Sequence, residues 1–350
     1  MKSYRIAIVG VMGAVGTQMV KMLEKSPIQV EFFKPLDTAD NIGELVDFRG
    51  SAWAVQEAKE GKFSDIDIVL FSAGAGASKT LAPIAVREGA IVIDNSSQWR
   101  MDENVPLVVP EVNPEALANH HGIVANPNCS TIQMVAALKP LHDAFCIKRV
   151  VVSTYQAVSG SGMAGIEELK SQTAAILERE DVVSKVFPHQ IAFNVIPQID
   201  GFLENGYTAE EWKMVEETHK ILSPDIEVSP TAVRVPVYRG HSESINVEFE
   251  RPFELDEIYQ VLESTAGIVL ADDVGRSEYP LAIDSKGKGS VFVGRIRRDF
   301  SIKNGINMWV VSDNLLKGAA LNTVQIAEKM IAMGLVDRDK ENIQTAEKPE

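Results

Sequence analysis

Cys129 is the residue of this chain whose surroundings best suit nucleophilic chemistry. It follows a strand-like apolar run (122–125) and Pro127, and a helical pattern of apolar residues begins just beyond it, at Ile132. A thiol in the first turn of a helix faces unpaired backbone N–H groups and the positive end of the helix dipole, and both favour the nucleophilic thiolate. The alternative for an isolated cysteine is a buried side chain that acts as a small hydrophobic residue.

The composition predicts a two-domain globular protein around this thiol. The chain has 350 residues, of which 45% are hydrophobic and 24% are charged, an ordinary balance for a globular protein. Its formal net charge of −15 argues against general binding to nucleic acid or to anionic membranes. An anionic ligand of such a protein therefore requires arginines or lysines that are gathered locally.

The cysteines and histidines of the chain indicate a reducing compartment and give no sign of a metal site. The two cysteines, Cys129 and Cys146, predict no disulfide framework, and a reducing cytoplasm fits them. The six histidines show no pairing with cysteine at metal-ligand spacing, so we expect no metal. The first residues lack the apolar core of a signal peptide, and no apolar run approaches membrane-spanning length.

The first third of the chain alternates strand and helix patterns. Short apolar strands are expected at 4–9, 30–33, 66–71, 90–94 and 107–109, and helices at 14–24 and 78–88. Short buried strands separated by helices indicate a parallel sheet that is covered on both faces. We therefore expect an α/β fold with a Rossmann-type, doubly wound parallel sheet.

The pattern changes after the helix that contains Cys129. A strand is expected at 149–155 and a helix at 166–178, followed by strands with polar alternation at 244–249 and 291–296. Such alternation is typical of a mostly antiparallel sheet in an α+β domain. A helical pattern at 313–333 is expected to pack back on the first domain. The predicted domains are 1–128 with 313–340, then 129–312, with a polar tail at 341–350.

Glycines at the end of the first strand predict a dinucleotide site. Gly10, Gly13 and Gly16 follow the first strand and open the first helix, where glycine lets the backbone approach a pyrophosphate at a helix N-terminus. The spacing is G-x-x-G-x-x-G, so the standard G-x-G-x-x-G fingerprint is met only in part. A second loop, Ser72–Gly76, is expected to line the same crevice. The alternative for both loops is a tight turn.

Several separated motifs together resemble one family, the aspartate-β-semialdehyde dehydrogenases. In chain order they are Gly10–Gly16, Asp94–Met101, Asn126–Thr131, Tyr155–Gly162, Phe193–Pro197, Glu217–Ile221, Arg234–Val237 with Gly240–Ser242, and Asp313–Ala320. The resemblance implies interconversion of aspartyl phosphate and aspartate semialdehyde with a nicotinamide cofactor and inorganic phosphate. It also implies a second domain that is catalytic and forms a homodimer or homotetramer.

The resemblance assigns roles to individual residues. Cys129 is expected to form the acyl-enzyme, with His241 as general acid/base and Gln156 positioning the reacting group. The expected substrate-binding residues are Arg234 for the α-carboxylate, Glu217 for the amino group, and Arg100, Lys220 and Asn128 for phosphate. The expected cofactor-binding residues are Gly10, Met12, Gly13, Ala14, Val15, Gly16, Asp37, Thr38, Ser72, Ala73, Gly74, Ser159, Gly160 and Asn314.

This division of roles agrees with elementary chemistry. A thiolate attacks an aldehyde to give an alkoxide, and loss of hydride leaves a thioester that phosphate can attack. A histidine with a pKa near neutrality can move protons in both directions, and the planar fork of arginine matches a carboxylate or phosphate. Each residue also has a plain structural alternative. His241 can be a satisfied turn histidine, and Glu217 with Lys220 can be a surface ion pair at i, i+3 spacing.

The cofactor loop after the second strand departs from the family pattern. Asp40 stands where family members usually carry an arginine, and Asp37 also faces the expected ribose. Carboxylates accept hydrogen bonds from ribose hydroxyls but repel a 2′-phosphate. NADP remains the expected cofactor from the family, and NAD is an alternative that these two residues favour. Lys34 is a nearby cation that could offset the repulsion.

Two other functions remain open at this stage. One is a related acyl-phosphate or acyl-thioester reductase, such as one acting on N-acetylglutamyl phosphate. Glu217 argues against it, because an N-acetyl group supplies no ammonium for this carboxylate. The other is a non-catalytic paralogue, which would be expected to lose the nucleophile or the base, whereas Cys129 and His241 are both present.

Overall fold

A computed structural model describes residues 2–336, which form two compact units. Unit 1 contains residues 2–110, 114–126 and 320–336, and unit 2 contains residues 111–113 and 127–319. The boundary thus lies two residues from the expected one, and residues 313–319 group with unit 2. The expected tail at 341–350, like residues 337–340, lies outside the described residues.

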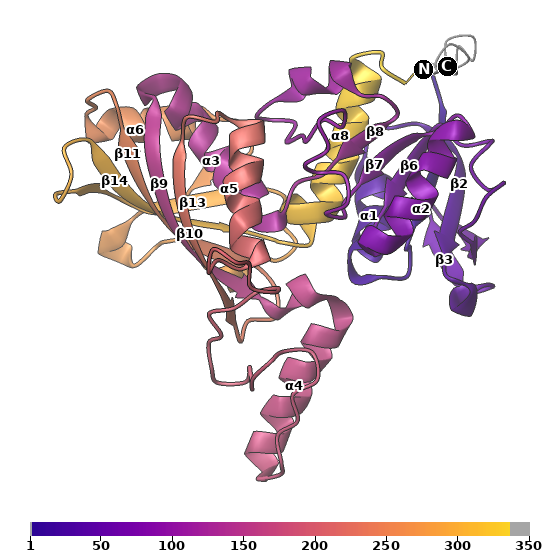
Figure 1. Cartoon of the computed structure of the whole chain (residues 1–350), viewed down its shortest axis with the longest axis horizontal. Coiled ribbons are helices and arrows are strands. Elements are labelled where there is room, and N and C mark those ends of the chain that lie inside the picture. The colour runs from indigo at the N-terminus through magenta and orange to yellow at the C-terminus, as the bar shows by residue number, and fades with distance from the viewer. Residues whose placement is uncertain (1, 337–350) are drawn as a thin grey trace. The chain divides into compact units, whose positions relative to one another are not determined.

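Unit 1 is built on a six-stranded parallel sheet with the strand order β5-β2-β1-β6-β7-β8 (Figure 1). Its strands are β1 (Tyr4–Val9), β2 (Val30–Asp37), β5 (Gln56–Glu57), β6 (Ile68–Phe71), β7 (Ile91–Asp94) and β8 (Ile123–Ala125). Its helices are α1 (Ala14–Lys25), α2 (Gly74–Arg87) and α8 (Leu321–Ala332). A separate hairpin pairs β3 (Leu45–Phe48) with β4 (Ser51–Ala54).

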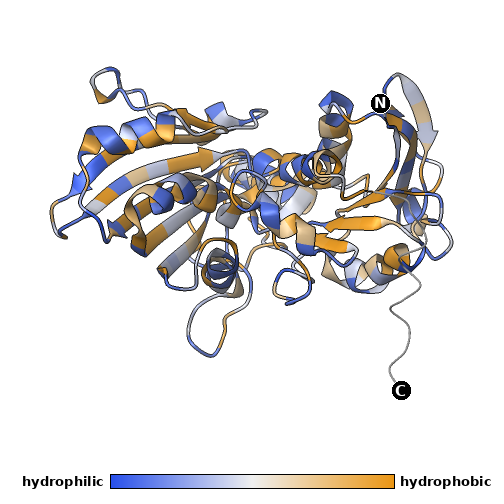
Figure 2. Cartoon of the chain, turned by 90° about the horizontal axis from the view of Figure 1, so that it is seen from above, coloured by the Kyte–Doolittle hydropathy of each residue, from blue (hydrophilic) through white to orange (hydrophobic). Residues whose placement is uncertain are grey.

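Strand order explains how helices cover both faces of this sheet. The β1-α1-β2 and β6-α2-β7 crossovers run in opposite directions along the sheet, and right-handed crossovers then place α1 and α2 on opposite faces. Helix α8 packs on α1. The β1 and β6 strands bury almost every residue, and Figure 2 shows hydrophobic residues concentrated along the strands of unit 1. The expected doubly wound parallel sheet is confirmed.

Unit 2 is built on a six-stranded mixed sheet with the order β10-β9-β11-β14-β13-β12. Its strands are β9 (Ile147–Ala157), β10 (Glu227–Val235), β11 (His241–Phe249), β12 (Ile268–Leu270), β13 (Val291–Asp299) and β14 (Gly305–Ser312). Its helices are α3 (Cys129–Phe145), α4 (Gly162–Glu178), α5 (Ala209–Ile221), α6 (Leu255–Glu263) and α7 (Ala282–Ser285). The three central pairings are antiparallel and the two outer pairings are parallel.

Burial alternates along the strands of unit 2, as the polar pattern predicts. In β11 every second residue from Ser244 onward is only half-buried, and its neighbours are buried. Helix α3 packs on the sheet through contacts with β9, β11, β13 and β14, whereas Figure 1 shows α4 extending away from it. The two-domain α/β and α+β architecture therefore agrees with the expectation.

Three expected elements differ in the structure. Residues 107–109 form no strand, and Leu107 makes only an isolated bridge to Ala125. Helix α2 begins at Gly74, so the expected loop at Ser72–Gly76 is reduced to its first two residues. The helical segment expected from residue 313 begins as a π-helical turn at Leu316–Ala320 and continues as α8.

No helix within the described residues 2–336 combines the length and the apolar character needed to cross a membrane.

Candidate active site

The glycine-rich loop of unit 1 is shaped by close backbone approaches. Gly10 has a φ of +78°, and a Cβ on it would lie 2.4 Å from the Ser72 carbonyl oxygen. A Cβ on Gly16 would lie 2.0 Å from the Gly10 carbonyl oxygen. The first contact packs the loop after β1 against the residue after β6, at the point where the strand order reverses, and the second closes that loop on itself. Ligands of open α/β sheets bind at such a switch point.

The N-terminus of α1 fits the pyrophosphate of a dinucleotide. The helix begins at Ala14, and the preceding Gly13 supplies no side-chain cap. The backbone N–H groups of the first turn, including those of Val15 and Gly16, therefore have no intrahelical acceptor. Together with the dipole of α1, they form a site for negative charge. These residues fit the expected cofactor-binding group.

Asp37, at the end of β2, accepts three hydrogen bonds from its own part of the chain. It is 8% exposed, and its carboxylate accepts hydrogen bonds from the backbone N–H of Met12 (2.8 Å) and of Thr38 (2.8 Å) and from the Asn41 side chain (3.0 Å). The carboxylate thus ties the glycine-rich loop to β2. Asp40 and Thr38 are exposed.

Lys34 does not offset the carboxylates near the expected ribose. Its ammonium is bound to the Asp65 carboxylate and to the Lys62 carbonyl oxygen. The Lys34 side chain is buried. These partners argue against a role of Lys34 in offsetting the repulsion of a 2′-phosphate.

Arg100, expected to bind phosphate, is a buried residue of unit 1. Its Nε donates to the Asn126 carbonyl oxygen (3.0 Å) and its Nη2 to the Asn95 carbonyl oxygen (2.8 Å). These bonds fix the guanidinium plane on the segment that leads into Asn126.

Ser72, Ala73 and Gly74, which were expected to bind the cofactor, are half-buried or exposed at the end of β6 and the start of α2.

Cys129 is the first residue of α3, as its sequence position predicts. Asn128 is the N-cap, and its Oδ1 accepts hydrogen bonds from the backbone N–H of Ser130 (2.9 Å) and of Thr131 (3.3 Å). Gly318 lies directly against the thiol residue, because a Cβ on it would be 2.7 Å from the Cys129 Cβ. The side chain of Cys129 is half-buried and forms no disulfide. The structure therefore places the thiol at the positive end of the α3 dipole.

The register of three adjacent strands gathers the other expected catalytic residues. Arg234 on β10 is paired with Gln156 on β9, and both lie near the carboxyl ends of these parallel strands. His241 is the first residue of the antiparallel β11. All three residues therefore lie at the same edge of the sheet, and all three are buried.

The hydrogen bond to His241 defines where its ring proton lies. The backbone N–H of Ala157 donates to Nδ1 (3.0 Å), so the neutral ring carries its hydrogen on Nε2. Nε2 is buried and has no hydrogen-bond partner among the described residues. Burial and, next, the positive charge of Arg234 lower the pKa of His241 to about 3. The ring is therefore neutral near pH 7 and offers an N–H donor.

Ala157 also positions Arg234, through its carbonyl group. Its carbonyl oxygen accepts a hydrogen bond from Arg234 Nη1 (2.7 Å). A Cβ on Gly160 would lie 2.7 Å from that Nη1 and 3.6 Å from His241 Cε1. Gly160, which was expected to touch the cofactor, is thus the close-packed neighbour of both side chains.

Ser159 and Asn314 contact each other within unit 2. The Asn314 Nδ2 donates to Ser159 Oγ (2.9 Å), and Asn314 Oδ1 accepts from the backbone N–H of Gly240 (2.9 Å). Asp313 beside it is paired with Arg239 (2.7 Å). These contacts hold the turn that carries His241.

Helix α5 supplies two more of the expected residues. Glu217 is buried, and its Oε2 accepts a hydrogen bond from the backbone N–H of Asn128 (2.7 Å). Lys220 is half-buried one turn further along the same helix. Unit 2 therefore brings together Cys129, His241, Gln156, Arg234, Asn128 and Glu217 on α3, α5 and one sheet edge.

Sequence reasoning missed Glu210, which is central to this cluster. It is 5% exposed and binds the side chains of Asn128, Gln156 and Lys213. Burial by itself would raise the pKa of Glu210, but the charge of Lys213 and the hydrogen bonds lower it to about 2. A signal was present in the sequence, because Glu210 and Glu217 are seven residues apart and so share one helix face.

Comparisons with known proteins identify the family. Residues 5–120 match the model "Semialdehyde dehydrogenase, NAD binding domain", and residues 138–317 match "Semialdehyde dehydrogenase, dimerisation domain". The chain is 51% identical over 344 residues to the aspartate-semialdehyde dehydrogenase of Bacillus subtilis, covering 96% of this chain and 99% of that protein. The chain belongs to the aspartate-semialdehyde dehydrogenase family. The resemblance seen in the separated motifs is therefore confirmed.

Other relatives agree with this assignment. The aspartate-semialdehyde dehydrogenase of Aquifex aeolicus is 51% identical over 338 residues, covering 95% of this chain and 99% of that protein. A crystal structure of aspartate semialdehyde dehydrogenase II from Vibrio cholerae, described as complexed with ASA, is similar with a TM-score of 0.93 at 48% identity and covers 95% of this chain and 99% of its own. This chain is thus an NAD(P)-dependent aldehyde oxidoreductase.

Proposed function

We propose that this protein is an aspartate-semialdehyde dehydrogenase that converts L-4-aspartyl phosphate reversibly into L-aspartate 4-semialdehyde and phosphate, with NADP(H) and a thioester on Cys129. The observation that carries the proposal is the position of Cys129 at the first residue of α3, in the unit that also gathers His241, Gln156 and Arg234. Family membership supplies the substrate class, because relatives at about half identity carry that name.

The proposed chemistry begins with the Cys129 thiolate. Its sulfur forms a bond to the acyl carbon, the bond from that carbon to the phosphate oxygen breaks, and phosphate leaves with the electron pair. The nicotinamide, when bound, supplies the hydride that reduces the resulting thioester. Cleavage of the carbon–sulfur bond then restores the thiolate and releases the aldehyde. We propose that His241 acts through its Nε2–H, which donates a hydrogen bond to the carbonyl oxygen of the substrate. Its Nδ1 cannot take up a proton in the same role, because it accepts the Ala157 N–H.

Substrate binding is assigned by charge. Arg234 uses one N–H on the Ala157 carbonyl oxygen, and its remaining N–H groups are proposed to hold the α-carboxylate. Glu217 is proposed to face the amino group, and Arg100, Lys220 and Asn128 to bind phosphate. Gln156 donates one amide hydrogen to Glu210, and its second amide hydrogen is proposed to position the reacting group.

The cofactor is proposed to bind unit 1 through the glycine-rich loop and the N-terminus of α1. NADP is the family expectation, and a related structure from Candida albicans, 26% identical with a TM-score of 0.75 and covering 96% of this chain and 100% of its own, is described as containing NADP. The exposed Asp40 and the bonded Asp37 carry negative charge near the end of β2. We therefore propose that the preference for NADP is relaxed and that NAD also serves.

The biological setting follows from the family. We propose a cytoplasmic enzyme in the biosynthesis of lysine and diaminopimelate, threonine, methionine and isoleucine. We also propose that it assembles as a homodimer or homotetramer, which the match to a dimerisation domain supports.

A spectrophotometric assay with aspartate semialdehyde, phosphate and each cofactor tests the proposal. We expect phosphate-dependent reduction of the cofactor, and its loss by at least about a thousandfold in Cys129→Ser, because the hydroxyl is far less ionised than the thiol. Cys146→Ser is the matched control and should keep full activity. Near wild-type turnover in Cys129→Ser, or sustained reduction of more than one cofactor per Cys129 without phosphate, would contradict the thioester route, in which only the first hydride transfer precedes phosphate attack. A preference for NADP of about a thousandfold or more would contradict the relaxed selectivity, since this corresponds to more than about 4 kcal/mol.

A further inference from the structure

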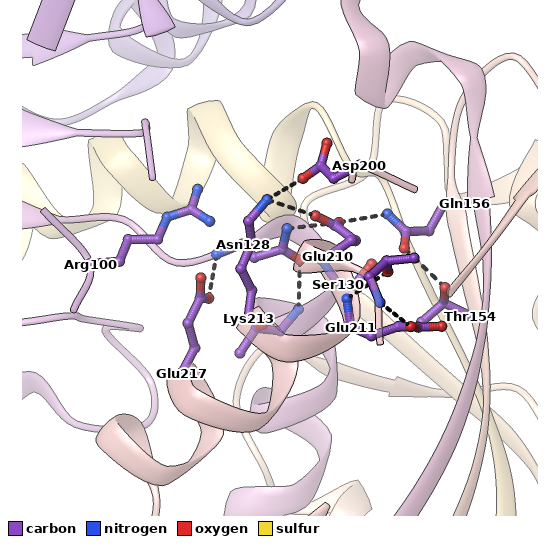
Figure 3. Close-up of polar contacts among 12 residues, drawn as sticks. Arg100, Asn128, Ser130, Thr154, Gln156, Asp200, Glu210, Glu211, Lys213 and Glu217 are labelled. Carbon is purple, nitrogen blue, oxygen red and sulfur yellow. Dashed lines mark hydrogen bonds and ion pairs between the residues drawn. The ribbon is translucent and has the colours of Figure 1, made fainter. Parts of the chain in front are cut away.

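Glu210 on α5 joins the side-chain amides of Asn128, which directly precedes Cys129, and of Gln156. Its Oε1 accepts hydrogen bonds from Asn128 Nδ2 (2.8 Å) and from Gln156 Nε2 (3.0 Å), and its Oε2 accepts one from Lys213 Nζ (3.1 Å). Figure 3 shows Glu210 between these side chains, with Lys213 also reaching Asp200. None of the roles assigned above uses this carboxylate.

The bond to Asn128 determines which way its amide points. Because a carboxylate accepts hydrogen bonds and donates none, Nδ2 must face Glu210 and Oδ1 must face the start of α3. There Oδ1 caps the helix through the backbone N–H groups of Ser130 and Thr131. The backbone N–H of Asn128 is bound by Glu217, two turns further along α5. Helix α5 thus holds the residue before Cys129 by both its backbone and its side chain.

The bond to Gln156 orients the second amide in the same way. Nε2 faces Glu210, and Oε1 accepts a hydrogen bond from Thr154 Oγ1 (2.9 Å). The amide therefore cannot turn over without placing two donors, or two acceptors, against each other. Its second N–H hydrogen keeps a single fixed direction.

Three donors require a carboxylate at this position. An ionised carboxylate has about four acceptor sites on two oxygens, whereas a glutamine amide accepts only through one oxygen. With glutamine at position 210, an NH2 group would face either Lys213 or the two amides. The low pKa of Glu210 agrees with an ionised group that all three donors stabilise.

We propose that Glu210 is a positioning residue of the reaction, which fixes the amides of Asn128 and Gln156 and through them aligns Cys129 and the reacting carbonyl group. The proposal rests on the function proposed above. In this proposal the Glu210 carboxylate orients both Asn128, the N-cap of α3, and Gln156, which is expected to position the reacting group.

Glu211, the neighbour of Glu210, provides a matched control. It is also a buried carboxylate on α5, but among the described residues its oxygens accept only backbone N–H groups, from Thr208 (2.7 Å) and Ala232 (2.9 Å). It caps its own helix and ties that helix to β10. Glu211→Gln should therefore lower stability without moving either amide.

Steady-state kinetics and alkylation of the thiol test the proposal together. We expect Glu210→Gln to lower kcat by about thirtyfold or more with KM for aspartate semialdehyde within about threefold, since small misplacements of reacting groups cost up to about a hundredfold. We expect Glu211→Gln to keep kcat within about twofold. The rate of iodoacetamide alkylation at Cys129, read by mass spectrometry relative to Cys146 in the same sample, should change by about fivefold in Glu210→Gln, because the Asn128 cap and the nearby charge both change, and should stay the same in Glu211→Gln.

Two outcomes would overturn the proposal. One is a kcat for folded Glu210→Gln within about threefold of wild type, and the other is an equal loss of kcat in Glu211→Gln. If Glu210→Gln does not fold, Glu210→Asp replaces it; this variant keeps the charge but withdraws it from the amides, and the same loss is expected. If the wild-type protein shows no phosphate-dependent reduction, the proposed function fails, whereas the alkylation comparison needs no substrate. An unchanged alkylation rate at Cys129 in folded Glu210→Gln would then overturn the role of Glu210 in place of the two kinetic outcomes.

Discussion

Glu210 and Glu243 are two buried carboxyl groups of unit 2 with opposite surroundings. Glu210, on α5, accepts hydrogen bonds from two amides and an ammonium group. Glu243, on β11 two residues after His241, has no exposed surface, and neither of its oxygens has a hydrogen-bond partner among the described residues. The Gln133 amide approaches Glu243, but its geometry completes no hydrogen bond.

Their pKa values move in opposite directions for this reason. Burial raises the pKa of Glu243 well above its ordinary value, and Gln133 opposes this only in part. Burial acts on Glu210 in the same sense, but Lys213, Gln156 and Asn128 outweigh it and lower the pKa to about 2. The comparison teaches that the donors around a buried carboxyl group decide its charge. Unit 2 therefore contains one buried carboxyl group whose surroundings favour the ionised form and one whose surroundings favour the protonated form.

Removing the cation beside Glu210 should have the largest effect on stability. Lys213→Met leaves a buried carboxylate with only neutral donors, so we expect a loss of about 2 kcal/mol in the free energy of unfolding. This is less than the usual cost of breaking a fully buried ion pair, because Lys213 is partly exposed to solvent. Urea unfolding at pH 7 measures it. Lys139→Met, which breaks the more exposed pair with Asp143, is the control and should cost less than about 0.5 kcal/mol.

The pH dependence of that loss follows from the low pKa of Glu210. The folded-state pKa is about 2 and the unfolded value is about 4.3, so the stabilisation is present above about pH 4.3 and is lost as the pH falls towards 2. The difference between wild type and Lys213→Met should therefore shrink over this range. A difference that stays constant would show that Glu210 is not an ionised partner of Lys213.

Neutralising Glu243 should have a smaller effect of the opposite sign. Because its folded-state pKa is raised, the unfolded chain loses its proton first, and wild-type stability falls as the pH rises above about 4.3. Glu243→Gln removes this penalty, so we expect a gain on the order of 1 kcal/mol at pH 8 that vanishes near pH 4. Thermal unfolding from pH 4 to 8 measures it. A loss of stability at pH 8 would mean that Glu243 is ionised and partnered.

The smallest expected effect is the coupling between the two groups. Lys213 and Glu243 share no hydrogen-bond partner among the contacts described, so the effects of Lys213→Met and Glu243→Gln should add within about 0.5 kcal/mol. Urea unfolding of the double variant at pH 7 measures the coupling. A coupling free energy larger than about 0.5 kcal/mol would show that Glu210 and Glu243 belong to one interacting network and are not independent.

Local patterns in the sequence were sufficient for much of the fold and the site. Glycines after an apolar strand predicted the loop before α1, and Pro127 followed by apolar residues at helical spacing predicted the start of α3 at Cys129. These features depend on neighbours within a few residues. The local pattern was not sufficient at 107–109, where only Leu107 pairs with β8, through Ala125, and a single bridge forms no strand.

Contacts between distant segments decided what the local patterns could not. The sequence does not show that the Asp37 carboxylate meets the backbone N–H of Met12, 25 residues away. Glu210 meets Gln156 across 54 residues, and His241 meets the Ala157 peptide across 84. No pattern in sequence specifies the register that creates these contacts.

The sequence by itself determined the family, the two sheets, and the residue types that can attack, donate and bind charge. The tertiary structure alone decided which side chains already have partners, and therefore which oxygens are ionised and where the proton of His241 lies. The physical reason is that reactivity of these groups depends on burial and on donors from other segments. Residue identity sets only the ordinary pKa of each side chain, from which the folded structure then shifts it.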